Sequence, residues 1–182
     1  MRTYLTAYIL VLCTALLASC SSSTKESTAE VNDGFIVKVG DKAPDFTITS
    51  IDGKEYSLSA LNGKVVMLQF TASWCRVCRE EMPFIERDIW QKHKDNPDFV
   101  LLALDRDEPA ERVVQFVETI GITYPIAPDV DSSVFTKYAN AEAGVTRNVL
   151  IDRNGKIVYL TRLYEEPKFK KFVAFIDSVL AQ

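Results

Sequence analysis

The chain has 182 residues, a length that suits one domain with a hydrophobic core and some additional terminal sequence. Hydrophobic residues make up 47% of the chain and charged residues 25%, as in ordinary globular proteins. The formal net charge is −4 and no stretch is rich in lysine and arginine, so we expect no nucleic-acid-binding surface.

The first 19 residues have the pattern of a secretory signal peptide. One arginine precedes an apolar run from Tyr4 to Ala18, which is too short for a stable membrane span. Small residues then lead to Cys20 and resemble a bacterial lipobox, in which cleavage leaves this cysteine as a lipid-modified N-terminus. The alternative is an ordinary signal peptide followed by a coincidental cysteine.

Residues 20–34 predict a flexible tether, because they lack large apolar side chains apart from one valine. The folded domain is then expected over residues 35–182, anchored to a membrane through lipid on Cys20. It would face an extracytoplasmic space of the bacterial cell envelope, most simply the periplasm. Disulfides persist in such a compartment, and Cys75 and Cys78 would be the only thiols of the domain.

The predicted elements begin with a β-hairpin over residues 45–61, whose two short strands are joined by an Asp52-Gly53 turn. Residues 65–70, VVMLQF, are continuously apolar, as in a strand buried on both faces. A helix follows, because apolar residues then recur at helical spacing: Cys78, Met82, Ile85 and Ile89. Pro83 is expected to kink this helix.

The second half of the chain alternates strands and helices. Predicted strands are 98–105, 123–127, 148–152 and 156–161, the last two joined by an Arg153-Asn154-Gly155 turn. Predicted helices are 108–118, a short capped helix at 131–139, and an amphipathic helix at 165–180. This order predicts an α/β domain with a central sheet covered on both faces.

The sequence SWCRVCREEMP, residues 73–83, places two cysteines three apart at a strand-to-helix junction. A c-type haem requires histidine directly after the second cysteine, where this chain has Arg79. A structural zinc site needs four ligands, and the only histidine, His93, is expected as a solvated surface residue on a polar helix end. A static disulfide over so small a loop would stabilise little. We therefore expect no metal and no cofactor.

Redox exchange fits the pair best. The first thiol, Cys75, would lie at a helix N-terminus, where unpaired backbone N–H groups and the helix dipole stabilise a thiolate. The positive charge of Arg76 is expected to lower the pKa of Cys75 further. Cys78 lies one turn into the helix and would resolve a mixed disulfide. Trp74 would shield the site and offer an apolar contact to a partner.

SWCRVCREEMP after an apolar strand, GVTRNVLIDRNGKIV at 144–158, and VGDKAPDF at 39–46 followed by Asp-Gly together resemble the TlpA/ResA-like family. These are membrane-tethered thiol–disulfide oxidoreductases with a thioredoxin fold, and the likeness covers the chain from about Val39 onward. The resemblance implies a central mixed β-sheet flanked by helices, with an added N-terminal β-hairpin. It also implies that Cys75 attacks and Cys78 resolves. The expected partners are envelope proteins bearing disulfides and a membrane thiol electron donor.

Two departures from the family pattern matter. The family usually has proline inside the C-x-x-C, where this chain has Arg76 and Val77, so the resemblance does not assign the direction of electron flow. A reducing role remains our expectation.

The family also has a cis-proline before the third core strand, and alignment puts Thr146 there. Because a cis bond before a non-proline residue costs about 3 to 4 kcal/mol, we predict a trans Val145–Thr146 bond. The Thr146 hydroxyl would hydrogen-bond a thiolate, or the residue would simply end a strand.

Deprotonation of Cys78 needs a base, and relatives often have a buried acid for this purpose. Glu80 and Glu81 are near in sequence, although at least one of them must face solvent. Glu142 and Arg147 near the Thr146 loop are weaker candidates, expected as solvated loop charges.

Two other functions remain open. Peroxiredoxins share this fold, but they need threonine three residues before the reactive cysteine, where this chain has Ala72 with Thr71 one residue too far. Arg147 near the facing loop keeps this alternative open. The domain would otherwise be a tethered binding module with a static disulfide.

Overall fold

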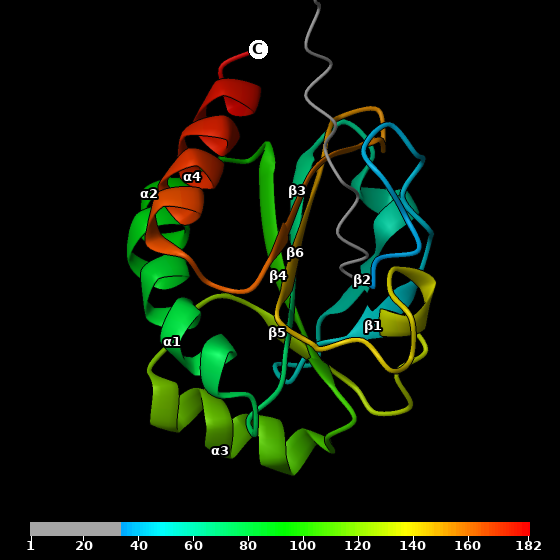
Figure 1. The fold of residues 1–182 in the computed structure, drawn as a ribbon, viewed down its shortest axis with the longest axis vertical. Helices are drawn as coiled ribbons and strands as arrows, with labels where there is room; N and C mark the ends of the chain where they lie inside the picture. The colour runs from blue at the N-terminus through cyan, green and yellow to red at the C-terminus, as the bar shows by residue number, and fades with distance from the viewer. Residues whose placement is uncertain (1–33) are drawn as a thin grey trace, which may run out of the picture. The chain divides into compact units, whose positions relative to one another are not determined.

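A five-stranded mixed sheet in the order β5-β4-β3-β6-β7 forms the centre of the domain (Figure 1). Strands β3 and β4 run parallel, as do β4 and β5, whereas β6 is antiparallel to both β3 and β7. The strands are β3 (Val65–Thr71), β4 (Phe99–Arg106), β5 (Ile126–Asp129), β6 (Arg147–Ile151) and β7 (Ile157–Arg162). The predicted thioredoxin-like fold is thus confirmed.

The computed structural model describes residues 34–182. The predicted signal peptide, Cys20 and nearly all of the predicted tether lie outside the described residues. Within the described part, the predicted N-terminal hairpin is present as β1 (Thr47–Thr49) and β2 (Glu55–Ser57), which pair in antiparallel register. A short 3₁₀ helix, η1 (Leu58–Leu61), follows the hairpin.

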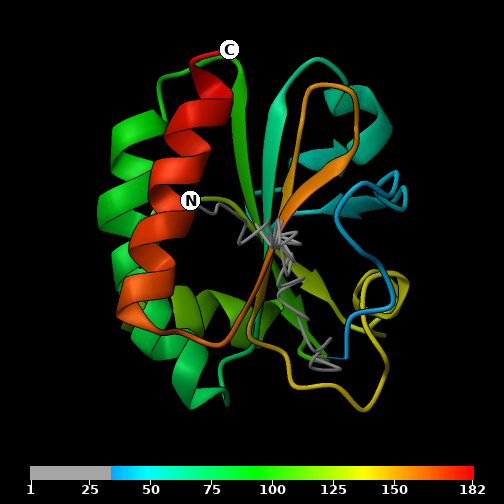
Figure 2. The ribbon, with the colours of Figure 1, turned by 45° about the horizontal axis from the view of Figure 1, so that its top comes forward.

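Helices cover one face of the sheet, and the hairpin lies on the opposite side (Figure 2). The helices are α1 (Arg76–Ile85), the π-helical turn η2 (Glu86–Trp90), α2 (Gln91–His93), α3 (Ala110–Ile120) and α4 (Glu166–Leu180). The hydrophobic core has two parts, one on each face of the sheet, and alternate residues of β3 contribute to each. Met67 packs with the apolar sides of α1, α3 and α4, whereas Leu68 packs with the hairpin side. Both faces of the sheet are therefore buried, as the apolar strand sequences predicted.

Pro83, where a kink was expected, lies inside α1, and the helix changes type three residues after it. The backbone N–H of Glu86 reaches the carbonyls of both Met82 and Pro83, and the π-helical turn η2 begins there. Proline supplies no N–H and its ring clashes with the preceding turn, and widening of the helix is one way to accommodate it.

Two local predictions need correction. The short helix expected at 131–139 is only one 3₁₀ turn, η3 (Phe135–Lys137). The residue that anchors it is Asp129, whose carboxylate accepts hydrogen bonds from the N–H groups of Val134 and Phe135 at 3.0 and 2.8 Å. His93 is also not a solvated residue. Its side chain is 13% exposed, because it packs against Phe99 and hydrogen-bonds Asp177 at 2.9 Å.

Candidate active site

The two cysteines lie where β3 leads into α1. β3 ends at Thr71, residues 72–75 form the active-site turn, and α1 begins at Arg76. Cys75 is the N-cap residue, and its sulfur accepts a hydrogen bond from the Cys78 backbone N–H at 3.3 Å. Both cysteines are free thiols in this structure, with Cys75 half-buried and Cys78 fully buried. The structure thus places Cys75 at a helix N-terminus, as the sequence predicted.

The two thiols differ strongly in acidity. Hydrogen bonding from the Cys78 thiol lowers the pKa of Cys75 to about 6, with further help from the Thr146 hydroxyl and from the backbone N–H groups of Cys78 and Val77, while partial burial opposes the shift. Burial raises the pKa of Cys78 far above its ordinary value, and the charge of Cys75 raises it further. At neutral pH, Cys75 is therefore a thiolate and Cys78 a thiol.

Thr146 lies directly against both sulfurs. Its hydroxyl oxygen is 3.1 Å from Cys75 Sγ and 3.2 Å from Cys78 Sγ. Among residues 34–182 the backbone contains no cis peptide bond, so the Val145–Thr146 bond is trans, as predicted. Thr146 ends the segment 139–146, which we name the facing loop. Its side chain does more than terminate a strand, because a single hydroxyl can donate to either sulfur.

Arg76 and Glu80 pair with each other at the surface of α1. The Arg76 side chain is 85% exposed, and its Nε pairs with the Glu80 carboxylate at 2.9 Å. The principal causes of the lowered pKa of Cys75 are the contacts from Cys78, Thr146 and the backbone, and Arg76 is not among them. Glu80 is wrong as a candidate base, because its carboxylate is half exposed and paired with an arginine.

Glu81 is the buried acid of the site. It lies one helical turn after Cys78, is 2% exposed, and accepts a hydrogen bond from Asn148 Nδ2 at 2.9 Å. Burial raises its pKa to about 7, the Asn148 hydrogen bond lowers it, and the charge of Cys75 raises it. Cys78 faces inward, and Glu81, three residues later, shares its face of α1. Glu80 lies two residues after Cys78 and therefore points to a different face.

A second acidic cluster, which the sequence analysis missed, holds the active-site turn. The Glu108 carboxylate accepts hydrogen bonds from the Ser73 N–H at 2.5 Å and from its hydroxyl at 2.6 Å, while Arg112 lies 3.5 Å from the same carboxylate. Behind it lies Asp105, fully buried at the end of β4, whose pKa burial and the charge of Glu108 raise to about 9. An aspartate at the end of an apolar strand, as in DFVLLALD, was the available sign.

The remaining predicted residues divide between solvent and core. Trp74 is 59% exposed beside Cys75, and Glu142 is exposed, as expected. Arg147 is not a solvated loop charge, because it is 1% exposed, stacks on the Phe35 ring at 4.4 Å and donates from Nε to the Gly144 carbonyl at 2.9 Å.

Residues 34–182 contain neither a metal-binding cluster nor a membrane-spanning helix. No group of three or more His, Cys, Asp or Glu side chains in this range is arranged to hold a metal ion. No helix in this range combines the length and apolar character needed to cross a membrane.

The fold and the thiol pair together define a thiol–disulfide oxidoreductase of the thioredoxin class. A family model described as Redoxin matches residues 38–176 of the chain. The chain therefore belongs to the redoxin family, and within it resembles the ResA-like thiol–disulfide oxidoreductases.

Curated relatives carry that activity in their names. The thiol–disulfide oxidoreductase ResA of Bacillus thuringiensis (strain Al Hakam) is 34% identical over 122 residues, covering 67% of this chain and 68% of the relative. ResA of Geobacillus thermodenitrificans (strain NG80-2) is 37% identical over 123 residues, covering 66% and 67% of the two chains.

Solved structures agree with this assignment. A Bacteroides thetaiotaomicron protein, assigned as a protein disulfide isomerase and solved in solution, is 61% identical with a TM-score of 0.80, covering 82% of this chain and 94% of its own. A Chlorobium tepidum protein, assigned as the thiol:disulfide interchange protein DsbE, is 28% identical with a TM-score of 0.70, covering 79% and 99%.

Proposed function

We propose that this oxidoreductase works in the cell envelope and reduces disulfides of protein partners through Cys75 and Cys78. The observation that carries the proposal is the asymmetry of the pair. Cys75 is half-buried with a pKa of about 6, whereas Cys78 is fully buried with a raised pKa. One thiol is thus ready to attack, and the other is protected until a mixed disulfide has formed.

The reaction begins with attack of the Cys75 thiolate on a partner disulfide. One partner sulfur leaves as a thiolate, and the other forms a mixed disulfide with Cys75. Cys78 then loses its proton and attacks the Cys75 sulfur, and the second partner sulfur leaves as a thiolate. Two electrons have passed from the pair to the partner, and the chain ends with a Cys75–Cys78 disulfide that a donor must reduce.

Glu81 is the group best placed to take the proton from Cys78. It lies one helical turn away and is buried, and its pKa of about 7 makes its carboxylate available near neutral pH. In the mixed disulfide Cys75 carries no charge, so its contribution to the raised pKa of Glu81 disappears, while burial still raises that pKa. More of Glu81 is then ionised at the moment when a base is needed.

The acidity of Cys75 supports the reducing direction. A low thiol pKa stabilises the reduced form and makes a pair more oxidising; the attacking thiol has a pKa of about 7 in thioredoxin and about 3.5 in the oxidant DsbA. Cys75, at about 6, lies nearer to the reductant. A reductant needs electrons from elsewhere, and a membrane thiol donor is the partner we propose.

Location in the envelope rests on the N-terminal sequence. The apolar run followed by Cys20 supports export and lipid anchoring. Metabolic labelling with a radioactive fatty acid tests this, and the label should enter the wild-type chain but not a Cys20→Ala variant. Equal labelling of the two chains would contradict the anchor while leaving the redox proposal intact.

The decisive test is the reduction potential of the Cys75/Cys78 pair, measured in glutathione or dithiothreitol buffers. A value near about −270 mV supports a reductant, and a value near about −120 mV contradicts it in favour of an oxidant. A pair that is not reversibly oxidised and reduced would favour the alternative, a tethered binding module with a static disulfide.

A trapping experiment separates exchange from the peroxidase alternative. Cys78→Ser should accumulate mixed disulfides with partner proteins through Cys75, because the resolving thiol is missing. Rapid peroxide turnover by the wild-type chain with a thiol donor, without such adducts, would favour the peroxidase.

A further inference from the structure

Thr146 lies in the facing loop, outside any helix or strand, and its side chain contacts both sulfurs. The hydroxyl is 3.1 Å from Cys75 Sγ and 3.2 Å from Cys78 Sγ. Strand β6 begins at Arg147, so Thr146 lies just outside the sheet, where only its carbonyl continues the pairing by accepting from the Leu163 N–H at 3.3 Å. The position of the hydroxyl therefore depends also on what holds the rest of the loop.

Side chains in the middle of the facing loop contribute little to holding it. Ala141, Glu142 and Gly144 are exposed, and Ala143 is only partly buried. Burial of apolar surface is the main force that fixes a segment on a domain, and these residues bury little of it. Val145, next to Thr146, is buried at 2% exposure, but residues 141–144 must be held chiefly by polar contacts to the loop backbone.

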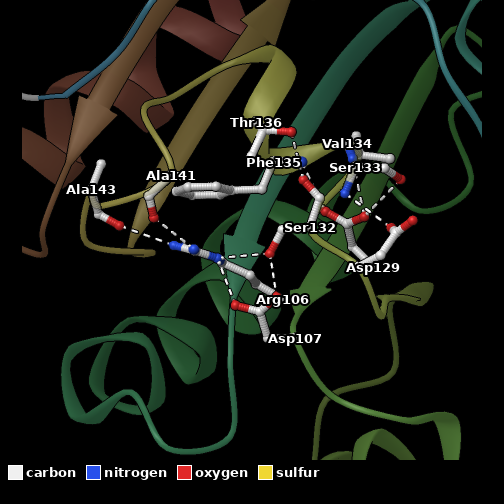
Figure 3. A network of polar contacts seen from close by, with 11 residues as sticks. Arg106, Asp107, Asp129, Ser132, Ser133, Val134, Phe135, Thr136, Ala141 and Ala143 are labelled. Carbon is white, nitrogen blue, oxygen red and sulfur yellow. Dashed lines mark hydrogen bonds and ion pairs between the residues drawn. The ribbon is translucent and has the colours of Figure 1, made fainter.

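Arg106, the last residue of β4, makes these contacts (Figure 3). Its Nη1 donates to the carbonyl of Ala143 at 3.1 Å, and its Nη2 donates to the carbonyl of Ala141 at 2.7 Å. The guanidinium also stacks on the ring of Phe135, 4.1 Å from the ring centre. One side chain thus hydrogen-bonds two backbone carbonyls of the loop, which lie two residues apart.

The third nitrogen of Arg106 is occupied as well. Nε donates to the Ser132 hydroxyl at 3.0 Å and lies 3.0 Å from the Asp107 carboxylate, and the Ser132 hydroxyl in turn donates to Asp107 (Figure 3). The Arg106 side chain is only 14% exposed. Its orientation is therefore also fixed by Asp107, which follows β4, and by Ser132, which follows β5.

We propose that Arg106 is a positioning residue for the thiol pair. By holding the carbonyls of Ala141 and Ala143, it keeps the Thr146 hydroxyl within hydrogen-bond distance of both sulfurs. The inference rests on the proposed role of Cys75 as the attacking thiol. A planar guanidinium binds several acceptors at once while stacking on a ring, which the single ammonium of lysine does not do. The shape of the side chain should matter more than its charge.

The two ends of the loop have independent supports. Near its start, the N–H of Asn140 donates to the carbonyl of Gly34 at 2.8 Å. At its end, the carbonyl of Thr146 accepts from the Leu163 N–H at 3.3 Å and from Arg162 at 3.5 Å. Loss of Arg106 should therefore loosen the middle of the loop while the domain stays folded.

A double-mutant cycle in the full-length chain tests the proposal with Arg106→Gln, Thr146→Val and the combination. The readout is the pH midpoint of Cys75 alkylation by iodoacetamide. Trypsin cleaves after Lys64, Arg76 and Arg79, so Cys75 and Cys78 fall in separate peptides, 65–76 and 77–79, that mass spectrometry distinguishes. We expect Arg106→Gln to raise the midpoint by about one unit, and by less than about 0.3 unit when Thr146 is already valine.

Three outcomes overturn the inference. One is an equal shift in both backgrounds, and another is no shift from Arg106→Gln in the wild-type background. The third is a wild-type midpoint in Arg106→Lys, which would mean that charge and not loop position is the cause. Arg87→Gln, at an exposed arginine paired with Asp88, is the matched control and should leave the midpoint unchanged.

Folding and the proposed function are checked separately. Urea unfolding of each variant shows whether it is folded. If Arg106→Gln is not, Ser132→Ala removes only the hydroxyl at Nε and should give a smaller shift that Thr146→Val abolishes; no shift would count against the inference. A wild-type midpoint near about 8.5, an ordinary thiol value, would instead refute Cys75 as the activated thiol.

Discussion

Two segments meet at the thiol pair, and they are held in place by different means. The active-site turn is held by the start of α1, which directs its backbone N–H groups at the Cys75 sulfur, and by the Glu108 carboxylate, which accepts two hydrogen bonds from Ser73. The facing loop has no regular structure, and side chains from distant strands hold it, above all Arg106. The reactivity of Cys75 depends on both, because its pKa is lowered by the helix start and by Thr146.

The difference teaches where a thioredoxin-like site can vary. A helix N-terminus stabilises a thiolate whatever the rest of the chain provides. The group opposite the thiols depends on how the fold supports a loop, and here that group is a threonine hydroxyl. If this comparison holds, the two segments contribute separately to the reactivity of the thiol pair, and substitutions in each should have effects of different size.

The largest effect should come from the turn itself. Cys75→Ser should lower the rate of disulfide exchange by at least about a thousandfold, because serine supplies no thiolate at neutral pH. A turnover assay with a disulfide-bonded protein substrate measures this loss. Cys78→Ser is the matched control, since it should retain the first attack and stall as a mixed disulfide. Residual turnover in Cys75→Ser would show that the buried Cys78 attacks directly.

Removal of the buried acid should have the next largest effect. Glu81→Gln should slow release of the mixed disulfide by about 100-fold, a typical loss for a missing general base. The base form of Glu81 is its carboxylate, whose pKa is about 7. That value applies with the Cys75 thiolate present, and in the mixed disulfide this charge is absent. The wild-type release rate should therefore rise with pH with an inflection below pH 7, whereas the variant should lose this rise.

Stopped-flow kinetics with a model disulfide, followed from pH 5 to 9, measures the release step. Glu80→Gln is the control, because the exposed Glu80 should leave the profile unchanged. A profile for Glu81→Gln that keeps its inflection below pH 7 would assign the proton transfer to another group.

A smaller effect should come from the facing loop. Thr146→Val keeps the shape of the side chain and removes the hydroxyl, so the pKa of Cys75 should rise by about one unit. The pH profile of Cys75 alkylation measures the shift, and Thr119→Val, at an exposed threonine of α3 whose hydroxyl hydrogen-bonds the Gln115 carbonyl, is the control. An unchanged pKa would mean that the helix start alone activates Cys75, and the comparison between the two segments would fail.

The smallest effect should come from Arg76, although its place next to Cys75 suggests otherwise. Its guanidinium is exposed and paired with Glu80, so solvent screens its charge. Arg76→Gln should raise the pKa of Cys75 by about 0.3 unit or less, measured by the same alkylation profile at low and at physiological ionic strength. A shift of a full unit would show that the arginine acts on the sulfur directly.

Regular elements were predictable where their signals are local. The boundaries predicted for the strands at 65–70, 98–105, 148–152 and 156–161 agree with β3, β4, β6 and β7 to within one residue. Each is a short apolar run bounded by turn residues or charges, so period and length settle the assignment. The strand predicted at 123–127 is displaced, since β5 covers Ile126–Asp129. It pairs only with β4 in the main sheet, and its start depends on that pairing.

Charged residues were predicted less well. Arg147 and His93 were both expected at the surface, yet one stacks on Phe35 and the other packs against Phe99 beside Asp177. Burial of such groups depends on partners far away in the chain, and a composition or period does not reveal them. The cluster of Ser73, Glu108 and Asp105 was missed for the same reason.

The sequence by itself determined the reactive pair, its place at a helix N-terminus and the order of the elements around it. These properties follow from local spacing, because a C-x-x-C after an apolar strand is compatible with few other chemistries. Only the tertiary structure decided which glutamate is buried beside Cys78, and that Arg106 supports Thr146 at the sulfurs. Those contacts join residues between about 35 and 70 positions apart, and only the packing of the sheet, its helices and its loops brings them together.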